Sequence, residues 1–325
     1  MKIAFKSPQR NLNLGSYRIH IEDLCHYFNS IGIVASINPK NILDYNIIIL
    51  SKNIKLNNKS KNTKYSNKKI GVITPSSDDI NTLCSVDFII VGSIEEKESL
   101  IGHNKNCFIF PQIENMYQNV VPKIHNNKKK TITIGYHGNP NHLNHMNNGL
   151  KWALEKLSET VKIKLVIICS SDDQWKIGKP NIDVVFIQWN IKTIVNDIQQ
   201  FDIGIVPAIS EIYKENKLDA NLTLGLYNTD YKIRFKNKSN IGRSLVLFQC
   251  GIPVVADMIP CNMHILANPD NGYAVASKEG WYYAMQELCC EKRRNFISKN
   301  AYTECRRLYN PIEWVSKLST QIKSI

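Results

Sequence analysis

The sequence lacks the long apolar run that a membrane span requires. No stretch of its 325 residues approaches the roughly 18–20 consecutive apolar residues needed to cross a bilayer. The opening segment, MKIAFKSPQR, also lacks the apolar core of a signal peptide and is typical of a first β-strand. We therefore expect a cytoplasmic protein, either free or held peripherally at the inner face of the membrane.

The cysteines lack the spacing of a metal site. Nine cysteines are scattered along the chain, their number is odd, and only Cys289 and Cys290 are adjacent. This pattern predicts buried free thiols rather than a disulfide framework or a zinc site. A G-x-G-x-x-G motif is also missing after the first strand, which argues against a dinucleotide-dependent oxidoreductase.

Acidic residues are scarce relative to basic ones. The chain has 41 Lys and Arg residues against 28 Asp and Glu residues, and its net charge is +13. The densest basic runs, 52–69 and 123–130, are rich in asparagine, and two interpretations of them stay open. They are solvated loops in a lysine-biased chain, or they attract an anionic membrane surface or an acidic glycan. Aromatic–basic interleaving is absent, so no specific nucleic-acid binding is expected.

Strand and helix patterns alternate along the chain. Near-continuous apolar runs such as YNIIIL (45–50) and IKLVIIC (163–169) predict buried parallel strands, with amphipathic helices between them. The alternation predicts an α/β protein with two Rossmann-like, doubly wound parallel-sheet domains. The polar segment 122–130 is the best linker candidate. We expect domains at 1–125 and 126–310 that face a cleft, and a C-terminal helix, 311–325, that packs back toward the N-terminal domain.

The most informative stretch is 232–257, KIRFKNKSNIGRSLVLFQCGIPVVAD. A cationic loop is expected to open an apolar helix at 244–250, which ends at Gly251 and is followed by a short strand. Backbone N–H groups at a helix N-terminus, together with cations, form a phosphate-binding site. The candidate donor-binding residues here are Lys236, Lys238, Asn240, Arg243 and Ser244.

Three more loops follow predicted strands in the second half. The first carries Gly138 and Asn139, and it is either a ligand-binding loop or a plain turn. The second carries Trp189, which stacks on a nucleotide base or simply packs. The third contains Pro207, at a strand exit. Because ligands of open α/β sheets bind beyond the carboxyl ends of strands, all four residues are candidates for the donor site.

Several motifs in order give the chain a family resemblance. They are GSYRIHIEDLCHYFNSIG (15–32), ITIGYHGNPNHL (132–143), FDIGIVPA (201–208) and RSLVLFQCGIPVVAD (243–257). With this order and spacing, the chain resembles GT-B glycosyltransferases, and is similar to the large retaining family 4. The resemblance implies a nucleotide-sugar donor bound by the second half and a glycan or lipid-linked acceptor bound by the first. It also implies that no metal or other cofactor is needed.

The chain departs from that family where two glutamates are usual, since Lys238 and Val246 stand at those positions. The resemblance therefore fixes neither the stereochemistry, although it favours retention, nor a UDP donor. Arg243 is expected to bind the donor diphosphate, because its planar guanidinium can hold two phosphate oxygens at once. His20 and His137 are the candidate catalytic residues. A non-catalytic binding subunit and a sugar-nucleotide 2-epimerase stay open as alternatives.

Overall fold

The computed structural model describes residues 1–8, 10–52, 54, 65, 67–75, 79–126, 130–211, 233–235 and 240–325. Contacts between Cα atoms divide the chain into two compact units. Unit 1 comprises Met1–Gln118, Asn240–Gly242 and Arg307–Ile325, and unit 2 comprises Asn119–Ser239 and Arg243–Arg306.

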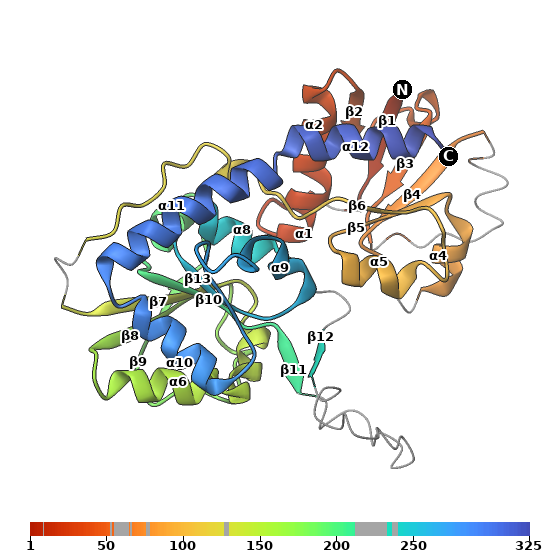
Figure 1. The fold of residues 1–325 in the computed structure, drawn as a ribbon. Coiled ribbons are helices and arrows are strands. Elements are labelled where there is room, and N and C mark those ends of the chain that lie inside the picture. Colours follow the sequence, from red (N-terminus) through yellow and green to blue (C-terminus); the bar gives the residue numbers. More distant parts are fainter. Residues whose placement is uncertain are drawn as a thin grey trace, which may run out of the picture. The chain divides into compact units, whose positions relative to one another are not determined.

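Unit 1 is built on a parallel six-stranded sheet with strand order β2-β1-β3-β4-β5-β6 (Figure 1). Its strands are β1 (Lys2–Lys6), β2 (Val34–Ile37), β3 (Ile47–Leu50), β4 (Lys69–Ile73), β5 (Phe88–Val91) and β6 (Cys107–Ile109). The apolar runs at β3 and β5 are buried at every position, as expected of central strands covered on both faces.

The helical elements of unit 1 include an unusual π-helical segment. They are α1 (Gly15–Tyr17), η1 (Arg18–Asp23, π), α2 (Leu24–Ser30), η2 (Ile42–Asp44), α4 (Ile80–Ser85), α5 (Ile94–Leu100), η3 (Asn115–Tyr117) and α12 (Pro311–Lys323). Val315 and Leu318 of α12 belong to the same core as Phe5 and Phe28, and Figure 1 shows α12 beside α2. The predicted return of the C-terminal helix is confirmed.

Unit 2 contains a second parallel sheet of six strands, with order β14-β13-β10-β7-β8-β9. The strands are β7 (Ile132–His137), β8 (Ile163–Cys169), β9 (Asp183–Gln188), β10 (Ile203–Val206), β13 (Val254–Asp257) and β14 (Tyr273–Val275). Two short strands, β11 (Ile209–Glu211) and β12 (Ile233–Phe235), pair antiparallel in a separate ladder. The expectation of a cationic loop before the helix is therefore wrong at 233–235, because the backbone there pairs with β11.

Helices alternate with these strands, so the predicted α/β fold class is confirmed. They are η4 (Pro140–Asn148), α6 (Leu150–Ser158), α7 (Ile194–Ile198), α8 (Gly242–Gln249), α9 (Pro260–Leu266), α10 (Lys278–Glu287) and α11 (Glu291–Leu308). The core of unit 2 includes Ile134 from the sheet, Leu154 from α6 and Trp281 from α10. Helix α8 begins at Gly242 rather than at 244, which places Arg243 inside its first turn.

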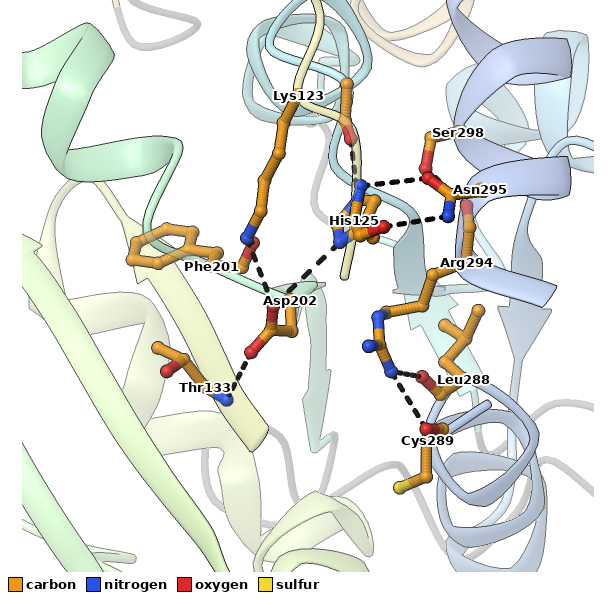
Figure 2. Close-up of polar contacts among 11 residues, drawn as sticks. Lys123, His125, Thr133, Phe201, Asp202, Leu288, Cys289, Arg294, Asn295 and Ser298 are labelled. Atoms are coloured by element: carbon orange, nitrogen blue, oxygen red, sulfur yellow. Dashed lines mark hydrogen bonds and ion pairs between the residues drawn. The ribbon is translucent and has the colours of Figure 1, made fainter. Parts of the chain in front are cut away.

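The segment that enters unit 2 is bound to it rather than solvated as a linker. Lys123 Nζ lies 3.0 Å from Asp202 Oδ1, and His125 Nε2 lies 2.9 Å from the carbonyl oxygen of Gly251 (Figure 2). Thr133 N donates to the other oxygen of Asp202. Burial alone would raise the pKa of Asp202, but the contacts with His125, Thr133 and Lys123 lower it below its usual value. The division between the units falls at Gln118, before this segment.

Two expectations about composition can be compared with the structure. Among the described residues, no helix combines the length and the apolar character that a membrane crossing demands. The cysteines are free thiols, as expected, but Cys84 and Cys290 are exposed rather than buried.

Candidate functional site

The carboxyl ends of three adjacent strands bring the donor-site candidates of unit 2 together. Strands β13, β10 and β7 are neighbours, and they end at Asp257, Val206 and His137. Ala208 N, just beyond β10, donates a 2.6 Å hydrogen bond to Asp257 Oδ2. This bond joins the residues just after β10 to the end of β13, at the edge of the sheet where ligands of α/β proteins usually bind.

Arg243 is positioned by the end of β7 and by the loop that follows it. Its Nη1 donates a 2.7 Å hydrogen bond to Tyr136 Oη, and its guanidinium lies 5.6 Å from the centre of the Tyr136 ring. Tyr136 Oη in turn donates to the carbonyl oxygen of Asn139. Gly138 has φ +122°, and a Cβ there would meet Arg243 Cδ at 3.3 Å. Glycine is therefore needed both for the backbone conformation and for the close approach of the arginine.

His137 holds the start of α8 rather than offering a free base. Its Nε2 lies 3.2 Å from the carbonyl oxygen of Arg243, so this nitrogen must carry the proton and donate it. Burial lowers the pKa of His137 to about 4, and the neighbouring Arg243 charge acts in the same direction. The imidazole is therefore neutral at pH 7. Its catalytic role stays a prediction, and its geometry is that of a positioning residue.

The N-terminus of α8 is capped from nearby. Asn240 Oδ1 accepts a hydrogen bond from Gly242 N, which satisfies one of the free N–H groups of the first turn. The Ser244 hydroxyl is buried and donates to Asn262 Oδ1, whose side chain is also buried. In this structure, Ser244 thus helps to join α8 to α9.

The other donor-site candidates are placed less closely. Pro207 is buried at the end of β10. Trp189 is half-buried after β9, two strands away from β7, which is a separation of roughly 10 Å between strand axes. Val246, at a position where the family has a glutamate, is 1% exposed and packs in the core. Lys236 and Lys238 lie outside the described residues.

In unit 1, His20 lies in a small cavity at the carboxyl edge of the sheet. Its Nδ1 is 3.2 Å from Thr74 Oγ1. The cavity has a volume of about 70 Å³, and its lining includes the hydroxyls of Ser7, Ser51 and Thr74. Burial lowers the pKa of His20 to about 4, with a smaller contribution from the Lys52 charge.

The π-helical segment that carries His20 also carries a buried ion pair. Arg18 Nη2 lies 2.7 Å from Glu114 Oε2, and both side chains are about nine-tenths buried. Asp23 Oδ2 accepts a hydrogen bond from Asn115 N. Burial raises the pKa of Asp23 to about 7, and the nearby Glu114 charge contributes in the same direction. The π segment is thus fixed to the loop after β6.

Comparison with solved structures agrees with this architecture. The chain superimposes on sucrose-phosphate synthase (tll1590) from Thermosynechococcus elongatus with a TM-score of 0.66 and 11% identity, covering 99% of this chain and 98% of that one. For Anabaena Alr3699/HepE, solved in complex with UDP and glucose, the TM-score is 0.61 at 12% identity, with both chains fully covered. The lipopolysaccharide outer core galactosyltransferase WaaB gives 0.59 at 13% identity, over 100% and 99% of the two chains.

The fold is GT-B. The predicted resemblance is thereby confirmed for the fold. No protein-family model matches the sequence, and no curated protein matches it either, so membership of family 4 stays a prediction. Within the described ranges, no group of three or more His, Cys, Asp or Glu side chains is arranged to hold a metal ion.

Sequence reasoning missed three residues of these sites. Tyr136 lies in an apolar strand, where an aromatic residue is ordinarily part of the core, and only its contact with Arg243 shows its role. Ser51 and Thr74 follow strands far from His20 in the sequence, so their approach to it depends on sheet order. A signal was available for Ser51, which directly follows the predicted strand 45–50, whereas Tyr136 and Thr74 lay within predicted strands.

Proposed function

We propose that this protein is a glycosyltransferase that moves a sugar from a nucleotide-sugar donor to a glycan or lipid-linked acceptor, in the synthesis of a surface polysaccharide or glycoconjugate. The observation that carries the proposal is the Arg243–Tyr136–Gly138 arrangement at the strand ends of unit 2. The GT-B fold supports it, because the superimposed structures include a sugar synthase and a galactosyltransferase, and one of them was solved with UDP.

Arg243 suits the role of a diphosphate ligand. It stands in the first turn of α8, where the helix dipole adds partial positive charge. Within the part of the chain that the structure describes, no carboxylate pairs with its guanidinium, and the phenol of Tyr136 orients it without neutralising it. Positive charge at this position stabilises a leaving diphosphate. The proposal accordingly assigns no step to a metal ion or cofactor.

Ligand-induced thermal stabilisation tests the donor site. We expect one of the UDP-, GDP-, CMP- or dTDP-sugars to raise the melting temperature by several degrees at saturating concentration. The Arg243→Ala variant should lose this shift. Arg306→Ala is the matched control, since Arg306 also lies over a tyrosine ring but is exposed. If no nucleotide stabilises the protein, or if both variants respond like the wild type, the donor-site assignment fails.

The stereochemical outcome and the alternatives can be separated by product analysis. We propose retention, on the basis of the resemblance to family 4. Proton NMR of the first product formed reports the anomeric configuration directly. A non-catalytic binding subunit would bind the donor without releasing nucleoside diphosphate, and a 2-epimerase would convert the donor with no acceptor present.

We further propose a cytoplasmic location with peripheral attachment to an anionic membrane surface. The support is a groove of about 750 Å³ at the amino edge of the unit 1 sheet, whose lining contains three lysines, Lys68, Lys69 and Lys323, and one acidic residue, Asp87. Lysines near an anionic bilayer contribute about 1 kcal/mol each. Replacing all three with glutamine should abolish sedimentation with phosphatidylglycerol vesicles, and unchanged sedimentation would refute this attachment.

A further inference from the structure

The cavity around His20 contains two polar atoms that the protein leaves unsatisfied. Among the described residues, His20 Nε2 and Ser51 Oγ are shielded from solvent and have no hydrogen-bond partner. Both side chains line the same 70 Å³ cavity. Buried polar groups are nearly always paired, and an orphan group costs free energy, so two in one cavity indicate a site that a ligand completes.

Sheet order explains why hydroxyl groups gather there. Ser7, Ser51 and Thr74 each directly follow one of the strands β1, β3 and β4, which are adjacent in the sheet. Their side chains therefore meet at one carboxyl edge, and the helical segment that begins at Gly15 supplies His20 from the side. This is the edge at which α/β sheets bind ligands.

Two unfavourable backbone conformations converge on His20. The residue lies within the π-helical segment Arg18–Asp23, and π-helical turns occur frequently at functional sites. Thr74 has φ +43°, a left-handed conformation that is rare for a β-branched residue. Between these two features, Thr74 Oγ1 lies 3.2 Å from His20 Nδ1.

The neutral imidazole of His20 suits an uncharged hydrogen-bonding group, and Lys52 lines the same cavity. Burial, assisted by the Lys52 charge, lowers the pKa of His20 to about 4, so the imidazole is uncharged at pH 7. A neutral imidazole that donates from Nδ1 to Thr74 presents a lone pair at Nε2. That lone pair and the Ser51 hydroxyl together suit a hydroxyl group, which donates to one atom and accepts from the other.

We propose that this cavity is an acceptor subsite that takes one uncharged hydroxyl or hydroxymethyl group of a glycoside. The sugar hydroxyl forms hydrogen bonds with both His20 Nε2 and Ser51 Oγ, donating to one atom and accepting from the other, and Thr74 Oγ1 holds the imidazole through Nδ1. The inference rests on the proposed transfer reaction, because it assigns the bound hydroxyl to the acceptor. His20 acts here by binding and orienting the acceptor, which is compatible with a retaining mechanism that needs no separate base.

Imidazole NMR of the full chain, labelled with ¹⁵N-histidine, tests the subsite without any donor. The probes are methyl glucosides, methyl galactosides and methyl N-acetylglucosaminides, with inorganic phosphate as the anionic comparison. The His20 signals are identified as those that disappear in the His20→Gln variant. We expect at least one glycoside to shift these signals, and the signals of the exposed His26 to stay unchanged. A larger response to phosphate, or no response to any glycoside, would overturn the proposal.

The Ser51→Ala variant provides an independent readout. If the cavity holds only water, removing an unsatisfied hydroxyl should be neutral or stabilising, and glycoside binding should not change. If the subsite is real, glycoside affinity and the acceptor KM should weaken by roughly two- to tenfold. The thermal shift caused by nucleotide should stay at its wild-type value in Ser51→Ala.

The two proposals fail separately. If glycosides shift the His20 signals but no nucleotide binds, the protein is a carbohydrate-binding protein and the glycosyltransferase proposal is refuted. If a nucleotide binds but no glycoside shifts the His20 signals, the donor-site proposal stands and the acceptor-subsite proposal is refuted.

Discussion

Arg243 is oriented by a phenol and a glycine. Tyr136 accepts a hydrogen bond from the guanidinium and lies beneath it, and Gly138 leaves space for the arginine side chain. A carboxylate in the place of Tyr136 would hold the guanidinium more strongly but would cancel the charge that a diphosphate needs. The arrangement thus keeps a fixed cation available.

Removing only the Tyr136 hydroxyl tests this positioning role. In Tyr136→Phe, the ring is retained and the 2.7 Å bond to Arg243 is lost. We expect nucleoside diphosphate affinity, measured by calorimetry, to fall by roughly three- to tenfold, the equivalent of one ordinary hydrogen bond. Tyr283→Phe, at a side chain that is 61% exposed, is the control. Equal affinities in the two variants would show that Tyr136 does not position the arginine.

The buried Asp23 predicts a specific pH dependence of stability. Its raised pKa, about 7, means that the folded state favours the protonated carboxyl. The folded chain therefore loses stability as the pH rises from about 4, where the unfolded carboxyl ionises, to about 7, and the loss stays constant above that.

Asp23→Asn should abolish this loss while keeping the bond from Asn115 N. We expect the variant to exceed the wild type in unfolding free energy at pH 8 by up to about 4 kcal/mol, and to lose the advantage near pH 4. Urea unfolding at the two pH values measures it, with the exposed Asp44→Asn as the control. If Asp23→Asn exceeds the wild type in unfolding free energy by the same amount at pH 4, the raised pKa of Asp23 is contradicted.

At the scale of elements, the end of α8 is shaped by the segment that packs against it. Gly251 has φ +75° and ends the helix. A Cβ at this position would lie 2.5 Å from Lys123 N, which itself bonds to the carbonyl oxygen of Cys250. Gly251 was expected only to end the helix, but its missing side chain also leaves space for the backbone at Lys123.

Two glycine substitutions separate these effects. Gly32 has φ +77° and nothing within 4 Å of the Cβ position, so Gly32→Ala carries only the backbone strain, about 1–2 kcal/mol. Gly251→Ala adds a steric clash, and we expect it to lower the unfolding free energy by at least a further 1–3 kcal/mol. Chemical denaturation of both variants measures the difference. Equal losses would mean that Lys123 does not pack there as described.

At the scale of the whole molecule, Asp202 joins the entering segment to unit 2. Its carboxylate lies against Lys123 and His125 and accepts from Thr133 N (Figure 2). The lowered pKa of Asp202 means that this stabilisation is present above the unfolded value near pH 4 and is lost as the pH falls further.

Asp202→Asn should therefore cost about 3–5 kcal/mol of unfolding free energy at pH 7, because it removes the carboxylate that pairs with the partly buried Lys123 charge. The deficit relative to wild type should shrink below pH 4. Glu159→Gln, which breaks an exposed pair with Lys156, should leave the unfolding free energy nearly unchanged at either pH. A deficit of Asp202→Asn that is independent of pH would contradict the role of its ionised form.

Much of the fold was predictable because the central strands are continuous apolar runs. The apolar runs at β3 and β8 are typical of buried parallel strands. Helix α9 was missed, and the β11–β12 ladder depends on pairing between remote segments. The segment around Lys123 was read as a linker from its composition, since only the tertiary structure shows its partners.

The sites were predictable to a smaller extent. Arg243 and Gly138 could be chosen because their residue types match phosphate binding and close backbone approach. The cavity at His20 could not be described beforehand, since the π-helical turn and the left-handed Thr74 have no counterpart in local sequence patterns.

The central claim is that Arg243 binds the diphosphate of a nucleotide donor. The most direct test is calorimetric titration of wild type and Arg243→Ala with a nucleoside diphosphate and with the matching nucleoside, starting with UDP and uridine. We expect the wild type to bind the diphosphate at least a hundredfold more tightly than the nucleoside, and Arg243→Ala to lose most of this difference. An undiminished preference for the diphosphate in Arg243→Ala would contradict it.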